Sequence, residues 1–260
     1  MKMNELKLVY FSPTGTTRKV IMEAARSIDL KSTSHDFSVY KEKKPVLKFA
    51  ENDFALFGIP VYYGRVPALF TEYLKGITGN GTPAALIATY GCRDYEDALL
   101  ELKDIVEKNG FKVIAAAAFP AEHSLDPTIG ARRPNKADLK TIAEYGVELN
   151  RRIKKSDTFD SFDISLPGNT PYRKYGKNML FPKADVNSCT ECKACAKVCP
   201  AGAISLKDPK KTDKDKCIGC LKCVRICRQN ARSVNSLKMK MVTSRLSKVC
   251  QSDKKADIFL

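Results

Sequence analysis

Short apolar runs without strict alternation recur along the first 155 residues, and segments of helical spacing lie between most of them. A strand that is apolar on both faces is typical of a parallel sheet covered by helices. Five such runs are "LKLVYFS", "HDFSVY", "DFALFGIPV", "PAALIATYG" and "FKVIAAAAF", which begin at Leu6, His35, Asp53, Pro83 and Phe111. The pattern therefore predicts an α/β fold with a doubly wound parallel sheet.

Helical periodicity is clearest directly after the first strand. There the apolar residues recur at Val20, Ile21, Ala24 and Ile28. Three further helices are predicted, over about 67–76, 94–109 and 135–154. Asn135 is the expected N-cap of the last one. Between Tyr40 and Asp53 the chain is rich in Lys and Glu, and the presence of a helix there stays open.

The loop after the first strand, "SPTGTT", combines hydroxyl groups, a glycine and the start of a helix. Backbone N–H groups and the helix dipole favour a phosphate dianion at such a place. Neither the Walker signature nor the G-x-G-x-x-G dinucleotide fingerprint is present. An ordinary N-cap explains the hydroxyls nearly as well. The loop resembles the phosphate loop of flavodoxins, with Ser12, Thr14, Gly15 and Thr17 on its pattern.

Two later loops match flavodoxin loops in their order along the chain. "GIPVYYGRVP" from Gly58 resembles the loop that covers the flavin ring, and "TYGCRDYED" from Thr89 matches the third flavin loop. The resemblance implies FMN and the flavodoxin-like strand order 2-1-3-4-5. The expected cofactor contacts are Ser12, Thr14, Gly15, Thr16, Thr17, Pro60, Val61, Tyr62, Tyr63, Gly64, Thr89, Tyr90 and Gly91. Cys92 lies in the third loop, and His123 lies in the loop after the fifth strand. No catalytic role is assigned to either residue.

Eight cysteines occupy two runs, "CTECKACAKVCP" from Cys189 and "CIGCLKCVRIC" from Cys217. Both have the spacing C-x2-C-x2-C-x3-C, which bacterial ferredoxins use to hold [4Fe–4S] clusters. Each cysteine has a counterpart 28 residues later, so the unit is duplicated and the copies should be related by a pseudo-two-fold axis. The region resembles a two-[4Fe–4S] ferredoxin over about 183–236.

In this arrangement the fourth cysteine of each run ligates the cluster of the other run. It is expected to begin a short helix and to point away from its own run. One cluster is expected at Cys189, Cys192, Cys195 and Cys227, and the second at Cys217, Cys220, Cys223 and Cys199. Tetrahedral zinc is the alternative for paired C-x2-C motifs, but four ligands would suffice for it. Cys227 departs from the ferredoxin pattern because Arg228 follows it instead of proline.

The remaining segments suggest a four-part organisation. Residues 1–155 form the FMN domain, 156–182 a polar linker rich in Gly and Pro, 183–236 the ferredoxin domain, and 237–260 a helix and tail. The tail helix is expected to be amphipathic and to pack on the protein through Met239, Val242, Leu246 and Val249. Cys250 lies outside the repeat and is left without a role.

The net charge of +16 is concentrated in the second half of the chain. Residues 156–260 carry 21 Lys and Arg against 10 Asp and Glu, and two clusters of charge 2− would leave this half basic. A basic surface favours acidic partners, and no nucleic-acid-binding module is recognisable. We therefore expect an acidic redox protein as the partner: a ferredoxin, a flavodoxin or a reductase.

The sequence also bears on location. No apolar run approaches the roughly 20 residues of a membrane helix, and the start "MKMNELKLVYF" is too short in its apolar part for a signal peptide. A cytoplasmic location is expected. In that compartment clustered cysteines are metal ligands more often than disulfides.

The whole chain resembles bacterial and archaeal proteins that fuse a flavodoxin-like domain to a two-cluster ferredoxin domain. The resemblance implies an electron-transfer flavoprotein in which electrons pass between an external carrier and FMN through the clusters. The alternative is a reductase that passes electrons to a small acceptor such as a quinone, a nitroaromatic or a nicotinamide. A redox sensor is disfavoured because no DNA-binding module is recognisable. A homodimer that brings the clusters of one subunit to the flavin of the other stays open.

Overall fold

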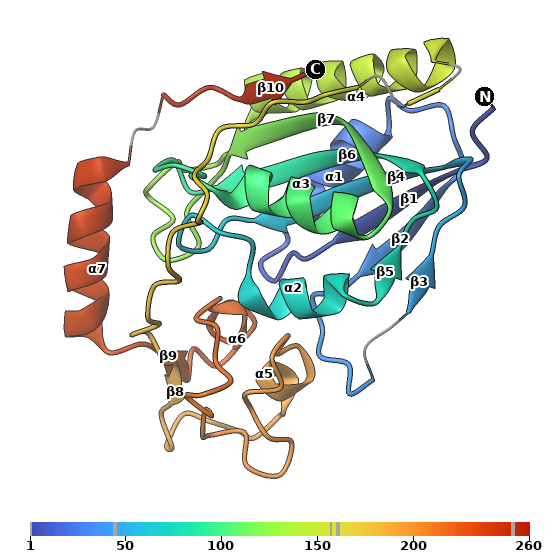
Figure 1. Ribbon diagram of the computed structural model, residues 1–260. Helices are drawn as coiled ribbons and strands as arrows, with labels where there is room; N and C mark the ends of the chain where they lie inside the picture. The colour runs from blue at the N-terminus through green and yellow to red at the C-terminus, as the bar shows by residue number, and fades with distance from the viewer. Residues whose placement is uncertain (1, 44–45, 157, 160–161, 251–252) are drawn as a thin grey trace.

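Five parallel strands form the central sheet of the computed structural model, which describes residues 2–43, 46–156, 158–159, 162–250 and 253–260 (Figure 1). The strands are β1 (Glu5–Tyr10), β2 (Ser32–Asp36), β4 (Asp53–Pro60), β6 (Thr82–Tyr90) and β7 (Phe111–Pro120). Their order across the sheet is β2-β1-β4-β6-β7, which is the flavodoxin-like order 2-1-3-4-5. The predicted doubly wound parallel sheet is confirmed.

Helices cover both faces of this sheet (Figure 1). They are α1 (Thr16–Ala25) and α4 (Lys136–Lys155) on one face, and α2 (Ala68–Leu74) and α3 (Ala98–Lys108) on the other. Because side chains alternate between the faces of a strand, β1, β4, β6 and β7 each contribute to two separate hydrophobic cores. The three predicted helices correspond to α2, α3 and α4. Asn135 caps α4 as predicted, and its side chain accepts the N–H of Asp138.

The second strand lies earlier in the chain than predicted. β2 ends at Asp36, so the prediction of a strand over "HDFSVY" was wrong for its last four residues. Phe37 leaves the strand and packs in the core beside Phe70 and Tyr73, which explains its apolar character. β2 itself is polar because it lies at the edge of the sheet.

The segment between Tyr40 and Asp53 holds a short strand in its described part. β3 (Leu47–Lys48) pairs in parallel with β5 (Ile77–Thr78), and no helix occurs in 46–53. Residues 44 and 45 of this segment lie outside the described residues.

The end of the chain returns to the first domain. β10 (Asp257–Phe259) pairs antiparallel with β7 and adds a sixth strand to the sheet, next to α4 in Figure 1. Phe259 packs against the core under α3. The sequence analysis expected only a tail here. Three residues are too short a run to show strand periodicity, and their pairing with β7 is a long-range contact.

The middle of the linker, residues 168–175, packs against the start of α3 and the residues beside it. The Asp97 carboxylate is buried and accepts the backbone N–H groups of Asn169 and Arg173. Arg65 forms a buried ion pair with Glu101. The rings of Tyr172 and Tyr175 lie 4.8 and 4.5 Å from the Arg65 guanidinium carbon. The linker is therefore fixed to the first domain by charge-assisted hydrogen bonds and stacking.

The cysteine-rich domain shows the predicted two-fold repeat in its backbone. Its short helices are α5 (Ala194–Lys197) and α6 (Lys222–Arg225), and β8 (Lys183–Ala184) pairs antiparallel with β9 (Arg232–Ser233). The N–H of Asp185 donates to Ala231 O, and the N–H of Asp213 donates to Ala203 O, both at 2.8 Å. Each bond therefore joins one repeat to the other, as a pseudo-two-fold axis requires.

The predicted C-terminal helix is present as α7 (Ser236–Val249), which stands at the side of the molecule (Figure 1). None of its residues is buried, and Val249 is 55% exposed. Met239, Val242 and Leu246 are half-buried, so the amphipathic stripe makes only partial contact with the rest of the chain. Within the described part of the chain, no helix is long and apolar enough to span a membrane.

We expect Gly146→Ala to lower the free energy of unfolding by about 1–3 kcal/mol. A Cβ atom at Gly146 in α4 would lie 2.1 Å from the carbonyl oxygen of Ala24, so α1 and α4 would have to separate. Val147→Ala is the matched control because Val147 is 59% exposed, and its effect should stay within about 0.5 kcal/mol. Urea unfolding followed by circular dichroism measures both. Equal effects of the two substitutions would contradict the close packing of these helices.

Candidate functional site

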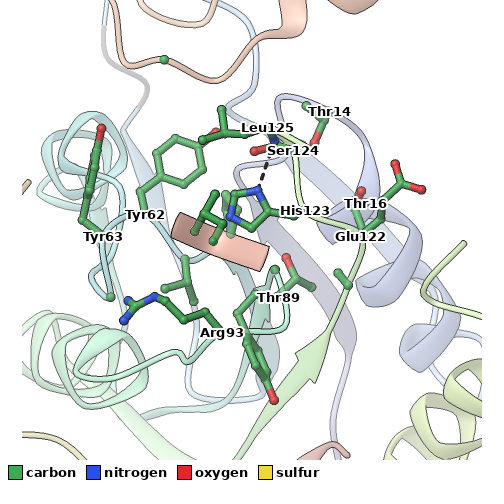
Figure 2. A pocket seen from close by; sticks show the side chains of 18 of the residues that line it. Thr14, Thr16, Tyr62, Tyr63, Thr89, Arg93, Glu122, His123, Ser124 and Leu125 are labelled. Carbon is green, nitrogen blue, oxygen red and sulfur yellow. Dashed lines mark hydrogen bonds between the residues drawn. The ribbon is translucent and has the colours of Figure 1, made fainter. Parts of the chain in front are cut away.

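The candidate site is a pocket of about 350 Å³ at the carboxyl ends of β1, β4, β6 and β7, here called the main pocket. Figure 2 shows Thr14 and Thr16 on one side of it and Tyr62 and Tyr63 on the other, with His123 between them. In doubly wound sheets, ligands bind at this end of the strands. Eleven of the thirteen residues expected to contact the cofactor line it: Thr14, Thr16, Thr17, Pro60, Val61, Tyr62, Tyr63, Gly64, Thr89, Tyr90 and Gly91.

The hydroxyl-rich loop reaches the main pocket through its threonines. Thr17 and Thr89 share a buried hydrogen bond of 2.6 Å between their Oγ1 atoms, which joins the first loop to the third. Ser12 and Gly15 are not among the lining residues. The Ser12 hydroxyl accepts the N–H of Arg18 at 2.9 Å, so it holds the start of α1. Gly15 has a φ of 90°, which a residue with a side chain adopts only under strain.

The two tyrosines are set by a tight turn. The backbones of Tyr62 and Arg65 exchange two hydrogen bonds of 3.0 Å. The two residues between them, Tyr63 and Gly64, have φ angles of 57° and 75°. Positive φ at both central positions is the signature of a hairpin turn of type I′. A Cβ at Gly64 would lie 1.7 Å from a carboxylate oxygen of Glu96, so the turn fits closely against the next loop.

A fourth loop, at 121–125 after β7, also lines the main pocket, and sequence reasoning gave it no cofactor role. The Nδ1 atom of His123 accepts the N–H of Leu125 at 3.2 Å, so the ring proton resides on Nε2. Burial lowers the pKa of His123, although Asp126 opposes this. The ring lies directly on Gly91, where a Cβ would be 2.2 Å from the His123 Cδ2 atom. The loop follows the fifth parallel strand. Ligands of doubly wound sheets bind at the carboxyl ends of the strands, so the position of this loop could have indicated that it lines the pocket.

Arg93 and Asp94 of the third loop also line the pocket. Further lining residues come from distant parts of the chain, and the sequence did not connect them with this site. They are Arg173, Ile218, Gly219, Val242 and Leu246. Arg93 and Arg173 both pair with Glu96, so their charges are partly neutralised. Cys92 is fully buried outside the lining, and its Sγ contacts Ala121 O at 3.5 Å. Cys250 Sγ contacts Gly91 O at 3.4 Å, which joins the end of α7 to the third loop.

The eight clustered cysteines surround two small cavities of equal volume. The first cavity is lined by Cys189, Cys192, Cys195 and Cys227, and the second cavity by Cys199, Cys217, Cys220 and Cys223. The structure therefore groups the cysteines across the two runs, in the sets expected from the ferredoxin spacing. Three cysteines of the second cavity are buried, whereas Cys192 of the first cavity is exposed. Burial raises the pKa of Cys220 to about 12 and that of Cys223 to about 11.

The short helices lie elsewhere than the sequence analysis expected. α5 contains the third cysteine of its run, Cys195, and ends before Cys199. α6 likewise contains Cys223 and ends before Cys227. The prediction that the fourth cysteine begins a helix was therefore wrong. The residues before the helices, Lys193 and Leu221, have φ near 60°, and this turn already reverses the chain.

The second cavity adjoins the main pocket within one chain. Ile218, between Cys217 and Cys220, lines both of them. Burial raises the pKa of Tyr62 well above its usual value, and the nearby Cys220 thiol adds to this increase. Tyr62 therefore lies close to the loop that carries Ile218. Among the described residues, the linings of the first cavity and of the main pocket have no residue in common. Arg232 of the first cavity donates to Thr212 of the second cavity, so these two cavities are neighbours. The second cavity therefore lies between the first cavity and the main pocket.

Comparison with known proteins gives one family match and several similar structures. Residues 188–232 match the model of a 4Fe-4S dicluster domain, and no curated protein matches the chain. A flavodoxin of Fusobacterium nucleatum bound to flavin mononucleotide is 19% identical, with 58% of this chain and 99% of that chain covered and a TM-score of 0.42.

Two other structures give similar values. A flavodoxin from the domain Archaea is 16% identical over 58% of this chain and 99% of that chain, with a TM-score of 0.41. An oxidoreductase from Corynebacterium diphtheriae is 17% identical over 60% of this chain and 100% of that chain, with a TM-score of 0.41. The strand order of the chain itself establishes the fold of the first domain. The chain thus joins a flavodoxin-like sheet to a 4Fe-4S dicluster domain.

Proposed function

We propose that this protein is an iron–sulfur flavoprotein that transfers electrons between FMN in the main pocket and one [4Fe–4S] cluster in each cysteine cavity. The observation that carries the proposal is the position of Ile218, which lines both the main pocket and the second cavity. A cluster ligated next to Ile218 would lie beside the flavin of the same chain. The dimer left open by the sequence is then not needed for this transfer.

The donor set of the main pocket fits FMN. Thr14 and Thr16 stand at the start of α1, where the helix dipole favours a phosphate group. Tyr62 and Tyr63 offer aromatic faces for the flavin ring. The volume of about 350 Å³ lies within the range of roughly 300–1,000 Å³ that is usual for ligand pockets. When bound, FMN would supply both one-electron and two-electron chemistry.

The two cavities fit [4Fe–4S] clusters better than zinc. Each is lined by four cysteines, three from one run and the last from the other. A single zinc ion needs only four ligands and gives no reason for eight cysteines in this exchange between the runs. The grouping across the two runs is the pattern of paired [4Fe–4S] clusters, and it supports the cluster interpretation.

The partner we propose is an acidic one-electron carrier that docks at the first cavity. Cys192 is exposed there, and Lys193 and Lys197 beside it are exposed too. The first cavity is also the cysteine site that does not adjoin the main pocket. An acidic ferredoxin, flavodoxin or reductase would be guided to this face by charge.

A reductase of a small acceptor is the second candidate function. The main pocket extends beyond the three flavin loops, to His123 and to Val242 and Leu246 of α7. These residues provide a wall for an apolar second molecule. Stopped-flow reduction with a panel of quinones, nitroaromatics and nicotinamides separates the two functions, since only a reductase turns over an acceptor faster than free FMN does.

Anaerobically purified protein should contain about eight iron atoms and one FMN per chain. Fewer than about four iron atoms with no flavin would contradict the proposed function. Thr17→Val should weaken FMN binding about tenfold because it removes the short hydrogen bond that joins the first loop to the third and leaves the Thr89 hydroxyl with only its long bond to Ile59 O. Flavin fluorescence quenching measures the affinity. Thr141→Val, on the outer side of α4, is the control and should leave it unchanged.

Cys199→Ala should damage the cluster of the second cavity, and Cys227→Ala that of the first cavity. Each variant removes a ligand from the cavity of the other run. Iron content and EPR spectra of the reduced proteins report which cluster is lost. Loss confined to the cluster of the same run would show that the assignment of ligands is wrong.

Charge reversal at the first cavity should slow reduction by an acidic carrier. We expect Lys193→Glu with Lys197→Glu to lower the rate about tenfold at low salt, with less effect at high salt. Reduction by dithionite should change little. Lys136→Glu with Lys140→Glu is the control, because both lysines are exposed on α4 with the same spacing. An equal loss in the control would indicate a general effect of net charge and would contradict docking at this face.

A further inference from the structure

The two cysteine cavities differ at one pair of positions related by the repeat. Arg232 lines the first cavity, and its counterpart 28 residues earlier, Ile204, lines the second cavity. Both side chains are buried, with 2% and 5% of their surface exposed. The repeat therefore places a cation beside one set of cysteines and an apolar group beside the other.

The guanidinium of Arg232 is held by uncharged oxygens. Its terminal nitrogens donate to Pro209 O at 3.0 Å and to Thr212 Oγ1 at 3.1 Å. In the part of the chain that the structure describes, no carboxylate forms an ion pair with it. Arginine does not lose its proton in proteins, so the charge remains in place although it is buried. Burial of a charge without an opposite charge is unfavourable unless another group compensates it.

The Nε atom of Arg232 is the one described buried side-chain N or O atom without a hydrogen-bond partner. A buried donor that lacks a partner is energetically unfavourable, and more so when the group is charged. The side chain lines the first cavity, so an acceptor bound there would satisfy Nε–H. A cluster with four thiolates is such an acceptor, and it carries negative charge.

We infer that Arg232 donates its Nε–H to a sulfur of the cluster in the first cavity and holds this cluster at a higher reduction potential than the second. The inference rests on the proposed function, because it requires both clusters. Reduction adds one negative charge to a cluster, and a fixed cation in a medium of low dielectric constant favours the more negative form. Hydrogen bonds to the sulfurs act in the same direction.

Arg232 also donates to Thr212, which lines the second cavity, so its charge acts on the second cluster as well, but without the hydrogen bond from Nε–H to a sulfur. An electron delivered at the exposed first cavity would then remain there in preference to the second cavity.

EPR-monitored potentiometric titration of the loaded protein tests the inference. Arg232→Gln removes the charge and should shift the potential of the first cluster to more negative values, with a smaller shift for the second. Arg228→Gln is the matched control because Arg228 follows the first-cavity ligand Cys227 but is exposed to solvent. Its potential shift should be small. The EPR signals are assigned to each cavity with the Cys199 and Cys227 variants.

Arg232→Lys keeps a charge but removes Nε–H, and it should shift the potential in the same direction by a smaller amount. Unchanged cluster potentials in Arg232→Gln would overturn the inference. Equal shifts of the potential in Arg232→Gln and in the control Arg228→Gln would overturn it too. It would also be overturned if Arg232→Gln and Arg232→Lys both failed to load clusters, since Arg232 would then serve assembly. Wild-type protein without two clusters would instead refute the proposed function.

Discussion

The packing of the partly buried Ile218 against two hydrophobic cores is the constraint on which the arrangement of the three sites depends. Its side chain packs against the core under α2 and α3 and also against the core between the cysteine runs. Because Cys217 and Cys220 flank it, this packing fixes the second cavity against the main pocket. Neighbouring hydrogen bonds act in the same direction: Asn178 donates to Cys217 O at 2.9 Å, and Lys222 donates to Ser38 O at 3.1 Å. The contact between the second cysteine run and the rest of the chain is therefore both apolar and polar. A displacement of this run by one residue would break several of these interactions at once.

The same geometry makes the two halves of the repeat unequal. The half that faces the main pocket has buried cysteines and Ile204 in its cavity, whereas the outer half has an exposed cysteine and Arg232. Duplication produces two equivalent units, and contact with the flavodoxin-like domain on one side only makes them inequivalent. Solvent exposure and nearby charge both influence cluster potentials, so this asymmetry gives a physical basis for unequal potentials of the two proposed clusters.

Much of this could be predicted from local patterns, and the failures have identifiable causes. The parallel sheet, α4 with its Asn135 cap, and the cross-run grouping of cysteines follow from periodicity or spacing within short segments. The three residues of β10 become a strand only by pairing with β7, which is distant in the sequence. The position of α7 likewise depends on contacts with distant residues, which its own fourteen residues do not specify. Phe37 was placed in a strand because its apolar side chain is needed in the core, although the backbone has already left the sheet. Ile218 could not be connected with Tyr62 from sequence, since their contact depends on how two separate domains pack.

The central claim is that electrons move from the second cavity to the main pocket within one chain. It is tested most directly by the rate at which bound flavin is reduced after rapid one-electron reduction of the clusters, measured over a tenfold range of protein concentration. Transfer across the Ile218 contact is unimolecular, so the observed rate constant should be first-order and should stay constant on dilution. A rate constant that rises in proportion to protein concentration would show transfer between molecules and would contradict transfer within one chain.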